Sequence, residues 1–141
     1  MRILMLLSIV CLCNGQTNAQ TYKLSGCGLM RAGTFKYLEA EDPTAYFVIT
    51  DTSHTEYYRN GKYHIKSRMK WVSDCKYSLI MFENTVPDFP FNIGDKLLVT
   101  INKVENDIIY YTSEIKGSKW ETSVRKIITT EKATLLSYLE K

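Results

Sequence analysis

The chain has 141 residues, with 18 basic and 15 acidic side chains and a formal net charge of +3 at pH 7. This near-neutral balance argues against a nucleic-acid-binding function, which relies on a strongly basic surface. Ten tyrosines and five phenylalanines, against three prolines and seven glycines, exclude a disordered chain and indicate an ordered domain that favours β-strands.

The N-terminal segment has the pattern of a secretory signal peptide. Arg2 precedes an apolar run over 3–13 that is too short to span a bilayer, and small residues before Gln20 provide a cleavage site. Gln16 marks a competing cleavage position. We expect a signal peptide over 1–19 and one β domain over 20–141, in a secreted or periplasmic protein.

Cys27 and Cys75 are the two cysteines that follow the expected signal peptide. In an oxidising compartment they form one obvious pair, and closing a loop of about 50 residues would contribute about 4 kcal/mol of stability. Free buried thiols are the main alternative. A metal site or a nucleophilic cysteine is less well supported, because the cysteines and histidines show no ligand spacing such as Cys-x-x-Cys. The signal-segment cysteines, Cys11 and Cys13, follow Val10 and Leu12, so a lipid-anchoring motif is not expected.

From Gly33 onward, short alternating runs separated by turn residues predict antiparallel strands. The strongest turn signal is Asn60-Gly61, because both residues tolerate positive φ and favour a two-residue type I′ hairpin. The eight predicted strands cover residues 33–38, 45–51, 54–59, 62–72, 75–83, 96–104, 108–115 and 119–127.

Alternation along these strands separates a core face from a solvent face. The side chains assigned to the core are Phe35, Tyr63, Ile65, Met69, Trp71, Cys75, Tyr77, Leu79, Met81, Leu97, Val99 and Ile101.

Two segments lie outside this strand pattern. The long connection over 85–95 carries Phe89 and Phe91, which would either plug one end of the fold or form a lid over a cavity. After it, Thr130 is a candidate N-cap for a short C-terminal helix with leucines at helical spacing.

Eight antiparallel strands in meander order predict a small barrel or, alternatively, a two-sheet sandwich. Gly33 lies two residues before Phe35 on the first strand, and Arg125 lies on the last, before the helical tail. This arrangement resembles the calycin layout of lipocalins, in which an arginine near the end of the barrel covers a Gly-x-Trp motif. The resemblance implies a closed barrel, with Phe35 in place of tryptophan.

Two longer motifs resemble small secreted bacterial proteins of uncharacterised function. They are Cys27-Gly28-Leu29-Met30-Arg31-Ala32-Gly33-Thr34-Phe35-Lys36-Tyr37 and Trp71-Val72-Ser73-Asp74-Cys75-Lys76-Tyr77. This resemblance implies a secreted β fold and no particular activity.

A two-residue turn at Asn60-Gly61 would place Glu56 opposite Ile65 and His54 opposite Ser67, all on the inner face. A buried carboxylate beside an imidazole is a candidate interior polar network. These three side chains would either satisfy one another by hydrogen bonds or orient a ligand inside the fold. Acid–base catalysis is the least supported function, because a second carboxylate is not placed beside Glu56. We expect no enzyme activity and no cofactor.

On the strand predicted over 62–72, the face opposite Ile65 carries a row of basic residues: Lys62, His64, Lys66, Arg68 and Lys70. It is either a solvated face or a docking surface for an acidic partner. The sequence therefore predicts a non-catalytic binding protein for a small apolar or amphipathic molecule inside a barrel. The alternative is an inhibitor or immunity-type protein that binds a protein partner through the basic face. Ligand, partner and oligomeric state are left open.

Overall fold

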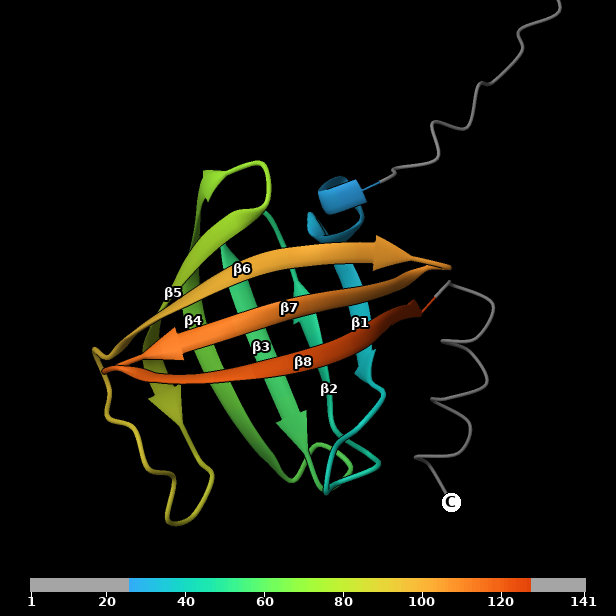
Figure 1. Ribbon diagram of the computed structural model, residues 1–141. Coiled ribbons are helices and arrows are strands. Elements are labelled where there is room, and N and C mark those ends of the chain that lie inside the picture. The colour runs from blue at the N-terminus through green and yellow to red at the C-terminus, as the bar shows by residue number, and fades with distance from the viewer. Residues whose placement is uncertain (1–25, 128–141) are drawn as a thin grey trace, which may run out of the picture.

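Eight antiparallel strands follow one another in chain order and close into a barrel, as Figure 1 shows. The computed structural model describes residues 26–127. The signal peptide expected over 1–19 and the helix expected after Thr130 therefore lie outside the described residues. The elements are η1 (Gly26–Met30), β1 (Gly33–Tyr37), β2 (Tyr46–Ile49), β3 (Ser53–Tyr58), β4 (Tyr63–Ser73), β5 (Lys76–Asn84), β6 (Lys96–Glu105), β7 (Ile108–Ile115) and β8 (Ser118–Ile127).

The all-β prediction is confirmed, and of the two predicted architectures the barrel is the one observed. β1 pairs with β8, with Phe35 opposite Lys126 and Tyr37 opposite Val124. Since every strand thereby has two neighbours, the sheet has no free edge.

The β3–β4 hairpin has the predicted register. Four residues, 59–62, connect the strands, rather than the predicted two. Asn60 and Gly61 adopt φ angles of 57° and 79°, the positive values at the centre of a type I′ turn, and Arg59 also has a positive φ of 48°. Tyr58 lies opposite Tyr63, Glu56 opposite Ile65 and His54 opposite Ser67. A one-residue slip would turn His54 and Glu56 outward, so this turn determines what the barrel contains.

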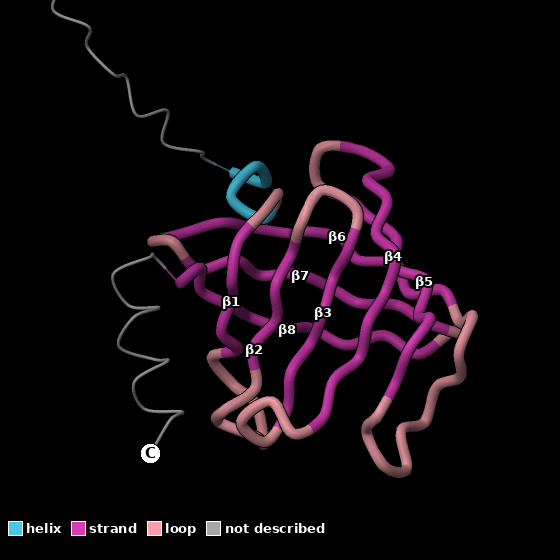
Figure 2. Tube along the Cα trace, turned by 180° about the vertical axis from the view of Figure 1, so that it is seen from behind, coloured by secondary structure: helices cyan, strands magenta, loops and turns pink. Residues whose placement is uncertain are grey.

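The 3-10 turn η1 lies over one end of the barrel, beside the β4–β5 turn (Figures 1 and 2). Its Met30 is fully buried, and a disulfide joins Cys27 to Cys75, which lies in the β4–β5 turn. Arg31 stacks on the Trp71 ring at 3.9 Å and pairs with Asp74. These contacts close this end, and the disulfide indicates an oxidising, extracytoplasmic location.

At the same end, Lys126 rather than Arg125 covers the aromatic ring of the first strand. The Lys126 amine lies 5.7 Å from the Phe35 ring centroid, and its Nζ is 3.4 Å from the Leu29 carbonyl oxygen. Arg125 is exposed, because Val124 is buried and alternate residues of β8 face opposite sides. The resemblance to the lipocalin layout assigned this covering role to Arg125, whereas the next residue along the chain, Lys126, has it.

Gly33 makes this close approach feasible. Its φ is +138°, and a Cβ atom there would lie 2.6 Å from Cε of Lys126. A larger residue would therefore be strained and would displace the lysine.

Most of the predicted core is buried at the centre of the barrel. Buried members are Phe35, Ile65, Met69, Tyr77, Leu79, Met81, Val99 and Ile101. Tyr63, Trp71, Cys75 and Leu97 are only partly buried. Phe47 of β2 was not assigned to the core, yet it is fully buried and stacks on Phe35 with ring centroids 5.1 Å apart.

Candidate functional site

The barrel end opposite η1 opens into a cavity of about 430 Å³. It is bordered by the β1–β2 loop, the β5–β6 connection and the start of β8, which lie far from η1 in both views (Figures 1 and 2). Its volume falls within the range of small-molecule sites. One half of the barrel is thus packed solid, while the other half is hollow.

Aromatic side chains form much of the cavity wall. Those that line it are Tyr37, Tyr58, Phe89, Phe91, Tyr111 and Trp120. Phe91 stacks on Trp120 with centroids 6.1 Å apart, and Phe89 meets Phe91 edge-on at 5.6 Å. The 85–95 connection, predicted to plug the fold or to cover a cavity, therefore borders the cavity mouth.

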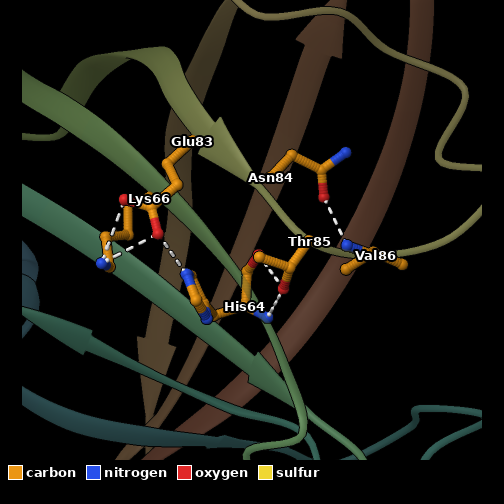
Figure 3. Close-up of polar contacts among 6 residues, drawn as sticks. All are labelled: His64, Lys66, Glu83, Asn84, Thr85 and Val86. Carbon is orange, nitrogen blue, oxygen red and sulfur yellow. Dashed lines mark hydrogen bonds and ion pairs between the residues drawn. The ribbon is translucent and has the colours of Figure 1, made fainter.

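This connection is held at both of its ends. Where it leaves β5, the Thr85 hydroxyl accepts a hydrogen bond of 2.8 Å from the His64 amide (Figure 3). Where it joins β6, the Gly94 amide donates to the Met81 carbonyl at 2.8 Å, and Asp95 pairs with Lys116 at 2.8 Å. Phe89 and Phe91 lie between these anchors, where their rings pack against each other and on Trp120.

The predicted polar residues of β3 face this cavity. His54 and Glu56 have side chains that are only 5% and 18% exposed, and Nδ1 of His54 lies 3.7 Å from Oε1 of Glu56. Ser67 is buried opposite His54, without a hydrogen bond to it within residues 26–127. The structure thus brings the three predicted residues to one wall of the cavity.

Sequence reasoning missed Tyr58 as a member of this group. Its hydroxyl donates a hydrogen bond to Oε2 of Glu56. The sequence contained the signal for it: Tyr58 lies two positions after Glu56 on one strand, and such residues share a face. The Tyr58 contact fixes one carboxylate oxygen of Glu56 and leaves the other directed toward His54.

Burial keeps the titratable side chains around Glu56 in their neutral forms. It raises the pKa values of Tyr37, Tyr77 and Tyr111, and the nearby Glu56 carboxylate raises them further. For Tyr58, burial again comes first, and both the charge of Glu56 and the hydrogen bond to it raise the pKa. Burial lowers the pKa of His54, although Glu56 opposes this shift. A neutral imidazole and neutral phenols therefore surround the Glu56 carboxylate.

The lowered pKa of His54 predicts a loss of stability in mild acid. The unfolded chain binds a proton at His54 below its ordinary pKa of 6.5, whereas the folded chain resists protonation. Stability is therefore expected to fall as the pH drops below 6.5, because unfolding takes up a proton.

Urea unfolding at about pH 7.5 and about pH 5.5 would measure this loss, which His54→Gln should reduce. His64→Gln is the control, since it leaves His54 in place. An equal loss in His54→Gln and the unchanged protein would contradict the assignment.

The outer basic row is partly neutralised by Glu83 of β5, as Figure 3 shows. Nε2 of His64 lies 2.5 Å and Nζ of Lys66 3.0 Å from Oε1 of Glu83. Hydrogen bonds from both side chains lower the pKa of Glu83. Sequence analysis missed this acid, which lies on the neighbouring strand β5 opposite Lys66.

The other three members of the row form no ion pair with the residues that the structure describes. Lys62 lies in the β3–β4 turn, 5.2 Å from the Tyr63 ring, and Arg68 lies 5.6 Å from the Phe82 ring on the outer wall. Lys70 is exposed. Among the described residues, an acid therefore compensates only the His64 and Lys66 part of the row.

In comparisons with known proteins, no family model, curated protein or solved structure matched this chain. Over residues 26–127, no group of three or more histidine, cysteine or acidic side chains is placed to hold a metal ion. No helix in the same part of the chain is long and apolar enough to cross a membrane. The barrel and its cavity are therefore the basis for a functional proposal.

Proposed function

We propose that this protein is a non-catalytic binding protein that holds a small amphipathic molecule in the open half of its barrel. The observation that carries the proposal is the cavity of about 430 Å³, whose wall combines aromatic side chains with a small set of polar groups that includes Glu56. Apolar walls with few polar groups are typical of small-molecule sites, because burial supplies affinity and the polar groups supply orientation. The disulfide supports a secreted or periplasmic setting for such a protein.

The alternative, an inhibitor or immunity-type protein that docks through its basic face, has less support. Glu83 pairs with two of the five cationic candidates, His64 and Lys66. Exposed ion pairs of this kind contribute little energy, and the Glu83 carboxylate offsets part of the positive charge that an acidic partner would meet.

Binding of N-phenyl-1-naphthylamine, a neutral apolar fluorophore, tests the cavity. We expect its fluorescence to rise when it enters the apolar cavity. A Kd on the order of 10 µM is expected for a neutral molecule of this size. Ser113 is 3% exposed and lines the cavity from β7. Ser113→Phe should fill part of the space and weaken binding by about tenfold or more, which corresponds to about 1.4 kcal/mol.

Ser123→Phe is the matched control. Ser123 lies on β8 next to the buried Val124 and opposite the exposed Tyr110, so its side chain points to the outer wall. It should leave the affinity unchanged. Equal affinities in both variants, or no binding by the unmodified protein, would contradict a ligand site inside the barrel.

A further inference from the structure

The cavity has a one-sided charge. Its lining includes the carboxylates Glu39, Glu41, Asp42, Glu56 and Asp95, and it contains no lysine or arginine among the described residues. The only imidazole on its wall is His54, which burial keeps neutral. The chain as a whole has more basic than acidic residues, so this composition is specific to the cavity.

These carboxylates do not have equal freedom to bind. At the mouth, Asp42 accepts hydrogen bonds from Thr44 and from the Arg59 amide, and Asp95 pairs with Lys116. Glu56 belongs to a strand interior and lies deeper. It is the carboxylate best placed to meet a ligand inside the barrel.

Glu56 retains one oxygen without a hydrogen-bond donor within residues 26–127. Tyr58 donates to Oε2, whereas the nearest approach of His54 to Oε1, 3.7 Å, exceeds hydrogen-bond length. The side chain is only 18% exposed, so bulk water compensates its charge poorly. His54, 5% exposed, also has no hydrogen bond to the described residues and lies on the same wall. Among the described residues, every fully buried side-chain nitrogen or oxygen has a hydrogen-bond partner. The unpaired Glu56 oxygen and His54 ring therefore open into the cavity, where a donor from a ligand can reach them.

An ammonium group matches these features best. It would donate to Oε1 of Glu56 in a charge-assisted hydrogen bond, the strong class of such bonds. The aromatic side chains around it favour a cation over their ring faces, and they also pack against an apolar group. A carboxylate or phosphate ligand would instead meet like charge at the mouth and at depth.

We propose that the ligand of this cavity is an organic ammonium compound with an aromatic or alkyl body. Its ammonium binds Glu56, and its body lies toward Phe89, Phe91 and Trp120 at the mouth. This inference rests on the proposed binding function and names the chemical class that the site selects.

Three indoles of matched size test the preference: tryptamine carries an ammonium, tryptophol a hydroxyl and indole-3-acetate a carboxylate. Isothermal titration calorimetry at about pH 7, where the amine is protonated, would compare their affinities. We expect tryptamine to bind about 10- to 100-fold more tightly than tryptophol, as for hydrogen bonds to charged groups, and indole-3-acetate to bind most weakly.

Glu56→Gln should remove most of the tryptamine advantage while it keeps the shape of the side chain. Glu121→Gln is its control: the exposed Glu121 on β8 is absent from the cavity wall, and the net charge changes equally. The ranking of the three indoles on the unmodified protein is decisive even where a variant does not fold.

The possible failures are distinguishable. If N-phenyl-1-naphthylamine binds but the three indoles bind equally, or indole-3-acetate binds best, the ammonium preference is wrong and the binding function stands. A tryptamine preference that survives in Glu56→Gln would overturn the role of Glu56. If neither the fluorophore nor any indole binds, both proposals fail.

Discussion

Replacing both Cys27 and Cys75 by serine is expected to lower the free energy of unfolding by about 4 kcal/mol. The disulfide joins residues that are 48 positions apart, and the loop it closes restricts the unfolded chain. Loss of that restriction stabilises the unfolded state. Urea denaturation of the double variant and the unmodified protein, followed by tryptophan fluorescence, would measure the difference.

The structural effect of this variant should be confined to the closed end of the barrel. The Cys75 carbonyl accepts a hydrogen bond of 2.8 Å from the Ile101 amide, and Met30, the last residue of η1, is fully buried. We therefore expect faster hydrogen exchange at Ile101, with little change at the cavity end. Fluorophore binding in the folded double variant should keep its affinity. A loss of stability below about 1 kcal/mol would mean that the unfolded chain is already restricted there without the disulfide.

The strand order and the β3–β4 register could be predicted because their causes are local. Period-two alternation identifies the strands, and the positive-φ preference of Asn60-Gly61 fixes the pairing that turns Glu56 inward. Each predicted strand boundary lies within two residues of the observed one. The prediction of His54 and Glu56 as interior residues follows from the same turn.

The pairing of the basic row with Glu83 could not be predicted in this way. A register shift between Lys66 and Ser67 in the β4–β5 pair places Glu83 directly opposite Lys66. A β-bulge arises from the way two complete strands pair, so the residue pattern of one strand does not predict it. The choice between Arg125 and Lys126 over Phe35 likewise depends on how β8 meets β1 on closure.

The cavity also has a non-local cause. Whether inward side chains fill a barrel depends on the combined volume contributed by all eight strands. Here the fully buried rings of Phe35, Phe47 and Tyr77 fill the packed half, whereas small residues such as Ala45, Ser67 and Ser113 lie among the aromatic side chains that line the other half. The contact between Phe91 and Trp120 joins the 85–95 connection to β8, and no short sequence pattern encodes such a contact.

Phe47→Ala should be among the most destabilising single substitutions, because Phe47 lies between the packed half and the cavity. It is fully buried, and its ring stacks on Phe35 on one side and on His54, at 4.7 Å, on the other. Removing a buried phenylalanine ring is expected to cost about 3–5 kcal/mol. Phe82→Ala is the control, since Phe82 is 44% exposed on the outer wall and should cost less than about 1 kcal/mol.

The space left by the Phe47 ring should join the existing cavity, since His54, which lines that cavity, is the neighbour on which Phe47 stacks. A neutral aromatic such as indole would then find additional apolar surface, as engineered cavities in protein cores do. Indole should therefore raise the melting temperature of Phe47→Ala more than that of the unmodified protein, because binding to the folded state alone stabilises it. An equal rise in the two proteins, with a large loss of stability in the variant, would show that the barrel collapses around the missing ring. In that case the apolar surface near Phe47 contributes little to affinity, and ligand binding depends mainly on Glu56 and on the side chains at the cavity mouth.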